Sequence, residues 1–209
     1  GPNVPLPAVV MTWHAPDASS PDAAALTVLD TILSSGKSSR LYDSLVYEQQ
    51  IAAEVYSDAS LPQQAGMVMV GAILASGKTL AEGEKALLAQ IARLRDKPVT
   101  EAELAEAKNE LIARKLRERE TIDGRAFAIG YALNTAGDPA LANRQLAELQ
   151  AVTAADVQRV AQRYLGDNSR MTILYQPESA RPSGEPDQTP KPPAVASTKY
   201  AGPVVTLAH

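Results

Sequence analysis

Hydrophobic positions in the first 75 residues switch between the spacing of a strand and the spacing of a helix. A β-rich run at 7–15 predicts a strand, and Ser20-Pro21-Asp22 predicts the start of an apolar-periodic helix with proline at its first position. A second, shorter helix is expected over 38–50. Two further β-rich runs, 52–59 and 66–75, are separated by turn residues, so they predict a hairpin.

Helical periodicity dominates the chain after this hairpin. The patterns Thr79-Leu-Ala-Glu82 and Thr100-Glu-Ala-Glu103 are capping boxes, in which the threonine hydroxyl and the glutamate bond each other's free backbone N–H groups. They predict two helix starts. The second helix has a weak point at 121–124, beyond which the pattern continues to Gly137. Two more helices are expected to begin at 138 and 153, followed by a closing strand at 171–176.

The order of these elements is strand, helix, helix, two strands, three or four helices, strand. It favours an α+β two-layer sandwich, with an antiparallel or mixed sheet covered on one face by helices, over a doubly wound parallel fold. We assign 7–177 to this domain, 1–6 to a leader and 178–209 to a linker or tail. The last segment is rich in proline and cannot bury enough apolar surface to offset the entropy of ordering it.

The composition of the 209-residue chain argues against several kinds of site and partner. Its 20 Lys and Arg against 24 Asp and Glu give a net charge of -4, which argues against nucleic acid as a partner. The absence of cysteine excludes disulfides, thiolate metal sites and cysteine nucleophiles. The two histidines, His14 and His209, are far apart in sequence, so we expect no metal site within this chain. His14 is interpreted as a hydrogen-bonded structural or interface residue.

The ends of the chain suggest that it is part of a longer protein. The start at Gly1-Pro2 resembles the scar of a cleaved tag, which leaves open a signal peptide or a whole domain before it. The Pro-rich end is typical of a linker, and we expect the gene product to continue past His209. The longest strongly apolar run, 67–75, has half the length that a membrane span needs.

One segment invites a nucleotide-binding interpretation. Gly71 and Gly77-Lys78-Thr79 follow an apolar strand and precede a helix, as a phosphate-binding loop does. Five residues separate the two glycines, however, where such a loop has four, so its backbone N–H groups would not converge on the phosphates. Nucleotide binding is therefore kept only as a remote alternative.

The segment 36–50, Gly-Lys-Ser-Ser-Arg-Leu-Tyr-Asp-Ser-Leu-Val-Tyr-Glu-Gln-Gln, resembles the non-catalytic domains of insulinase/pitrilysin-type zinc metallopeptidases. This superfamily also contains the mitochondrial processing peptidases. The resemblance extends to the helix that begins at Thr100-Glu101 and to the stretch 152–165, and it covers residues 9–177 in the family's order of elements.

The resemblance implies a role without catalysis in this chain. In the family, a first domain carries the zinc motif His-x-x-Glu-His, whose two histidines and a distal glutamate hold the metal. This sequence has no such motif. We therefore expect a domain of the processing-peptidase-like fold that shapes the substrate chamber and supports a catalytic domain of the same polypeptide or of a partner subunit. Zinc is expected in that catalytic domain, and the chain alone is expected to be inactive.

The resemblance also indicates candidate substrate-binding residues. Active relatives place an Arg and a Tyr, seven residues apart, near the substrate, and alignment puts these positions on Tyr47 and Glu54. Arg40 and Tyr47 are also seven residues apart, but Arg40 belongs to the Ser-Ser-Arg-Leu element, so an ion pair within the domain is the alternative for it. A peptide is the expected substrate, and the periplasm or cell envelope the expected location, with the cytoplasm left open. The alternative function is an assembly domain of a proteolytically inactive relative.

Overall fold

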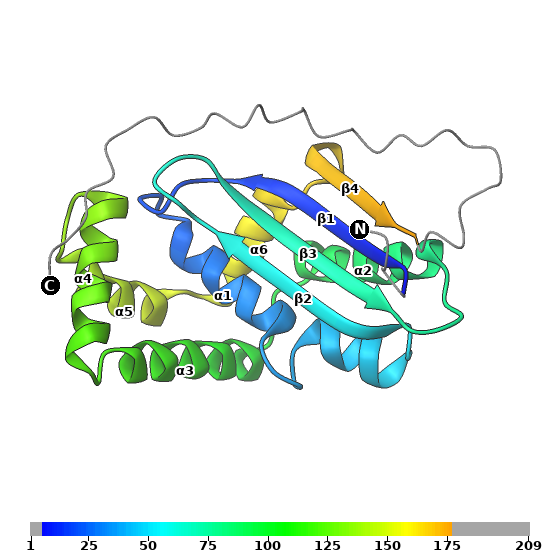
Figure 1. Ribbon diagram of the computed structural model, residues 1–209, viewed down its shortest axis with the longest axis horizontal. Coiled ribbons are helices and arrows are strands. Elements are labelled where there is room, and N and C mark those ends of the chain that lie inside the picture. The colour runs from blue at the N-terminus through cyan, green and yellow to red at the C-terminus, as the bar shows by residue number, and fades with distance from the viewer. Residues whose placement is uncertain (1–5, 177–209) are drawn as a thin grey trace, which may run out of the picture.

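The computed structural model describes residues 6–176, so the predicted tail at 178–209 and most of the predicted leader lie outside the described residues. Four strands form one sheet in the order β2-β3-β1-β4, and every neighbouring pair is antiparallel. The last strand returns to lie beside the first, as the sequence suggested (Figure 1). The strands are β1 Ala8–Ala15, β2 Ala52–Ser60, β3 Gly66–Leu74 and β4 Arg170–Tyr175.

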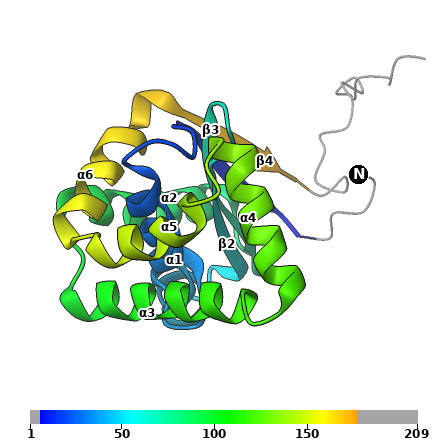
Figure 2. The ribbon, with the colours of Figure 1, turned by 90° about the vertical axis from the view of Figure 1, so that its left-hand side faces the viewer.

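The helices lie on one face of this sheet, which confirms the predicted α+β two-layer sandwich (Figures 1 and 2). Helices α1 and α6 pack against each other, and α2 and α6 both contact β1. The helical elements are α1 Ala23–Ser34, a π-helix Tyr42–Glu48, α2 Leu80–Asp96, α3 Glu101–Glu118, α4 Ile122–Ala136, α5 Leu141–Ala151, α6 Ala154–Tyr164 and a 3₁₀ turn Asp167–Ser169.

Alternation along the strands separates the two faces of the sheet. On β1, Val9, Met11 and Trp13 are at most 2% exposed and belong to the main hydrophobic core beneath the helices. The polar end of the Trp13 ring is satisfied, because its Nε1 donates to the carbonyl of Gly166 at 3.0 Å. His14 points to the other face and is exposed. Side chains that alternate along a strand lie on opposite faces, so the core is built from every second residue.

Local capping chemistry fixes where the helices begin. Both predicted capping boxes are present: Thr79 and Thr100 accept from the backbone N–H three residues on and are bonded in return by the glutamates there. Thr153 and Asp156 form a third at the start of α6. The helical pattern expected from Thr100 onward breaks at the predicted weak point, so α3 and α4 are separate helices. Five helices therefore follow β3, where three or four were expected.

Two segments differ from their predicted form. Helix α1 begins at Ala23 rather than at Pro21, because Ser20 bonds the backbone N–H of Asp22 in a turn and Asp22 forms no side-chain cap. The short helix expected over 38–50 is mostly a π-helix, with Gln49 N–H bonded to the carbonyl of Ser44 five residues earlier.

In the described part, no helix combines the length and hydropathy that crossing a bilayer requires.

Candidate functional site

Residues 35–40, which follow α1 and include Ser38-Ser39-Arg40, are hydrogen-bonded to helix α3. Three glutamates spaced along one side of α3 accept hydrogen bonds from this segment, so it cannot move independently of that helix. The bonds run from Ser35 Oγ to Glu110 Oε1 at 2.5 Å, from Ser38 Oγ to Glu106 Oε1 at 2.6 Å and from Arg40 Nε to Glu103 Oε1 at 2.7 Å.

Arg40 forms the strongest of these contacts. Its Nε and Nη2 donate to the two carboxylate oxygens of Glu103, at 2.7 and 3.2 Å, in the bidentate geometry that suits guanidinium and carboxylate. The Arg40 bonds, together with those from the Thr100 backbone and hydroxyl, lower the pKa of Glu103 from 4.5 to about 2. The Arg40 side chain is only 14% exposed. This guanidinium therefore serves the ion pair within the domain that the alternative interpretation expected.

The other two candidate residues lie on the surface. Tyr47 belongs to the π-helix and is 74% exposed. The π-helix is held in place on its inner side, where the hydroxyl of Ser44 accepts from the buried amide of Gln90 at 2.7 Å. Glu54 is exposed on the edge strand β2, at a β-bulge. A substrate-binding role for Arg40, Tyr47 and Glu54 stays a prediction.

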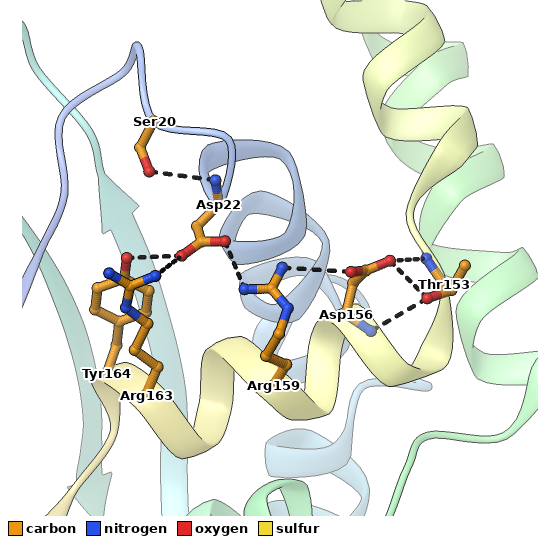
Figure 3. A network of polar contacts seen from close by, with 7 residues as sticks. All are labelled: Ser20, Asp22, Thr153, Asp156, Arg159, Arg163 and Tyr164. Carbon is orange, nitrogen blue, oxygen red and sulfur yellow. Dashed lines mark hydrogen bonds and ion pairs between the residues drawn. The ribbon is translucent and has the colours of Figure 1, made fainter.

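A second polar cluster joins the start of α1 to the closing helix α6 (Figure 3). Its centre is Asp22, whose side chain is 4% exposed. One carboxylate oxygen accepts from Arg159 Nη1 at 2.7 Å, and the other accepts from Arg163 Nη1 at 3.0 Å and from the Tyr164 hydroxyl at 2.8 Å. These partners lie about 140 residues from Asp22 in sequence. The cluster therefore ties the first helix of the domain to its last.

The electrostatics of this cluster indicate a structural role. Burial would raise the pKa of Asp22, but the hydrogen bonds from Arg159 and Tyr164 and the charges of Arg159 and Arg163 outweigh it, so the pKa is lowered. A carboxylate is a poor general base when its pKa is lowered and its oxygens already accept hydrogen bonds from the donors around it. The sequence interpretation treated Asp22 only as part of a helix start. The signal it missed was a pair of arginines four residues apart on α6.

A groove of about 560 Å³ lies between the start of α1, α5 and α6. Most of its charged lining is paired within the chain: Arg144 contacts Asp138 at 2.7 Å, Arg159 contacts Asp22, and Asp156 bonds Thr153. Glu148, which also lines the groove, is exposed. No buried side-chain nitrogen or oxygen in the described residues lacks a hydrogen-bond partner.

The described residues do not fit a zinc ion. Between residues 6 and 176 no three His, Cys, Asp or Glu side chains are grouped so that they could hold a metal. His14 is the only histidine among them, whereas His209 lies outside the described residues. The glycine that suggested a phosphate loop, Gly71, lies inside β3, where it pairs with Val10 and Tyr56. Its backbone N–H is therefore part of a strand and not of a loop.

Comparisons with known proteins agree with this geometry. The sequence matches the family described as "Peptidase M16 inactive domain" over residues 1–111. No curated protein matches it.

Solved structures share the fold over most of the chain. The chain is 29% identical to a candidate zinc protease from Bordetella pertussis Tohama I, with a TM-score of 0.73 over 84% of this chain and 96% of that one. It is also 29% identical to the inactive peptidase domain of a candidate zinc protease from Bordetella parapertussis, with a TM-score of 0.74 over 82% and 91% of the two chains. A protease from Helicobacter pylori, at 24% identity, has a TM-score of 0.79, and the match spans 83% of this chain but 42% of that one.

Proposed function

Because the chain belongs to the family of peptidase M16 inactive domains, we propose that it is the non-catalytic domain of a zinc metalloendopeptidase. It would form part of the wall of the chamber in which a peptide substrate lies. A separate domain, in the same polypeptide or in a partner subunit, would carry His-x-x-Glu-His and the zinc. This chain contributes no step of the hydrolysis itself.

The family match over residues 1–111 carries the proposal, and the chemistry of the chain supports it. With only two histidines, far apart in sequence, the chain cannot supply the paired histidine ligands of the motif. The Helicobacter pylori protease is more than twice as long as the part matched here, which is consistent with a further domain beside this one. The fastening of residues 35–40 to α3 suits a rigid wall, since both ends of the segment are fixed.

The proposal is tested by measuring hydrolysis with and without a catalytic domain. The purified chain with added zinc should not cleave a quenched fluorescent peptide library, whether or not a chelator is present. A zinc-loaded domain that carries His-x-x-Glu-His, from the same gene or its neighbour, should cleave the library faster when this chain is present. Hydrolysis by this chain alone that a chelator abolishes would refute a non-catalytic role. A partner that lacks the zinc motif would instead favour the assembly domain of an inactive relative.

A further inference from the structure

A hollow of about 660 Å³ lies where α3, α4 and α5 meet. Helix α4 rises from the end of α3, and α5 lies in the angle between these two helices and contacts both (Figure 2). A cavity of this size falls within the range of sites that bind small ligands. We call it the α4 hollow. Its lining includes Lys115 and Arg119 at the end of α3, Phe127 and Tyr131 of α4, and Gln145 of α5.

One wall of the α4 hollow is aromatic. Phe127 and Tyr131 are four residues apart, so both rings lie on the same side of α4. Their exposed fractions are 77% and 49%, whereas Ala132, on another side of the helix, is 1% exposed and clusters with Leu141. Two rings that are this exposed beside a cavity offer a large contact area to a bound apolar side chain.

The α4 hollow continues into a smaller cavity of about 160 Å³. Lys115, Tyr131 and Gln145 line both spaces, so these three side chains mark the junction between them. The smaller cavity is lined mainly by alanine and leucine side chains, among them Leu61 and Leu149. It has room for about five water molecules, at about 30 Å³ each. It therefore suits one apolar side chain and not a further length of peptide.

The junction carries a positive charge without a partner. Lys115 is half-buried, and among residues 6–176 its ammonium has no hydrogen bond or ion pair. No described side-chain nitrogen is both fully buried and unpartnered, so this ammonium must reach open space, and Lys115 lines the two cavities that meet here. Burial lowers the pKa of Lys115; Glu118 opposes this shift, while Arg119 and Arg114 add to it. The loss of water around the charge is therefore not offset by a partner in the described chain.

Two neutral polar groups lie at the same junction. The side-chain amide of Gln145 and the hydroxyl of Tyr131 form no hydrogen bond within the described part of the chain. The other cation of the lining is engaged, because the Arg119 guanidinium donates to the carbonyl of Ala142. An ammonium, an amide and a hydroxyl beside an apolar space are suited to hold a carboxylate and the peptide bond next to it.

The acidic side chains of the lining restrict where an anion can lie. Glu118 and Asp123 line only the wider space, and Glu148 lines only the smaller one of these two. All three are exposed, so water screens their charges more than that of Lys115. The junction is therefore the position in these two cavities where a negative charge meets a positive one.

We propose that the α4 hollow binds the carboxyl end of a peptide whose last two residues are large and apolar. The terminal carboxylate lies against Lys115 at the junction, beside Gln145 and Tyr131. The last side chain enters the smaller cavity, and the side chain before it lies against Phe127. The peptide ends at the junction because the smaller cavity has no room for further residues, which favours a terminal carboxylate over that of an aspartate or glutamate. The choice of a peptide rests on the proposed function, whereas the carboxylate and the apolar side chains rest on the geometry.

Binding is tested by fluorescence anisotropy with the full 209-residue chain and a short peptide that ends in Phe-Leu and carries fluorescein at its amino end. The Kd should be about 10–100 µM, the range expected when about 20 ligand atoms contact the protein. A carboxamide in place of the terminal carboxylate should raise the Kd at least about 10-fold. Lys115→Met, which keeps the apolar stem and removes the charge, should have the same effect. Phe127→Ala should raise the Kd about fivefold.

Two controls separate binding from folding. Lys85→Met, at an exposed lysine on α2 away from the α4 hollow, is the matched substitution and should leave the Kd unchanged. Lys115→Met should not lower the melting temperature, because the charge that it removes is half-buried and has no partner among the described residues. Weaker binding by this variant then reports the lost charge and not a damaged fold.

Several results would overturn the proposal. The first is no binding up to about 1 mM of the full chain, which includes the case in which residues outside 6–176 fill the hollow. Equal binding of the carboxamide peptide, unchanged binding by Lys115→Met, or a fall in the melting temperature of that variant would each contradict the role of Lys115. A carboxamide peptide that ends in aspartate and binds as tightly as the free acid would contradict a terminal carboxylate. Binding is measured without a catalytic domain, so its failure is distinguishable from failure of the hydrolysis test.

Discussion

Replacing Glu103 with glutamine should separate the ion pair of Arg40 from the capping of α3. The carboxylate of Glu103 accepts two bonds from Arg40 and two from Thr100. Glutamine retains an acceptor for the Thr100 backbone N–H, since it also serves at this position of a capping box. Glu103→Gln therefore removes the charge of the pair and leaves the helix start in place.

The structure sets the size of the effect. The pKa of Glu103 falls from 4.5 to about 2, and at about 1.36 kcal/mol per pKa unit the whole difference corresponds to roughly 3.4 kcal/mol. The Glu103 side chain is 32% exposed, so solvent screens the pair, and the Thr100 bonds that contribute to the lowered pKa partly persist in the variant. We expect Glu103→Gln to lower the free energy of unfolding by about 1.5 kcal/mol at pH 7.

The pH dependence gives the sharper test. Because the folded pKa lies below the unfolded value, the stabilisation is fully present above the unfolded pKa of 4.5 and is lost as pH falls toward about 2. In urea titrations followed by far-UV circular dichroism, the difference between the two proteins should shrink by more than half between about pH 7 and pH 3. Glu101→Gln, an exposed glutamate in the same helical turn, is the control and should cost at most about 0.5 kcal/mol. A difference that stays constant with pH, or that the control reproduces, would refute the argument.

Two further substitutions test the packing of the domain. Asp22→Asn should lower the free energy of unfolding by about 2 kcal/mol, because it removes a buried charge that accepts from Arg159; a loss below about 0.5 kcal/mol in urea titration would contradict a stabilising role for the cluster. Gly124→Ala should lower the melting temperature, since a Cβ there would lie 1.7 Å from the backbone oxygen of Glu118, with a cost of about 2 kcal/mol. Gly130→Ala, in the same helix with nothing within 4 Å, should instead raise the melting temperature, because it stabilises the domain by about 0.5–1 kcal/mol. Equal effects of the two substitutions would show that helix propensity alone decides the change in stability.

Local patterns predicted the elements of the domain well. The Thr79 and Thr100 capping boxes predicted two helix starts because the bonds that fix such a start span only three residues. The β-rich run at 7–15 predicted β1 because β-branched and aromatic residues favour strands. The short helix was placed correctly, but its π form was not predicted, because it depends on how Ser44 meets Gln90, 46 residues away.

Partners distant in sequence were beyond the reach of these patterns. Glu103 was predicted as a capping residue, but nothing in its neighbourhood indicated that it would also accept from Arg40, 63 positions earlier. Asp22 was taken for part of a helix start, whereas the fold makes it the anchor of α6. A carboxylate can bond any donor that the topology brings near it, so its partner is decided by the packing of whole elements.

The sequence by itself determined the kind of domain: its strands, its helix starts, its lack of a zinc motif and its resemblance to inactive peptidase domains. Only the tertiary structure decided which apolar side chains are exposed among residues 6–176. Ile122, Ile129 and Leu133 of α4 have the spacing of a buried helix face, yet all three are exposed. Periodicity shows only that one side of a helix is apolar. The short connections of α4 to α3 and α5 decide that this side of α4 does not pack into the main core of the domain.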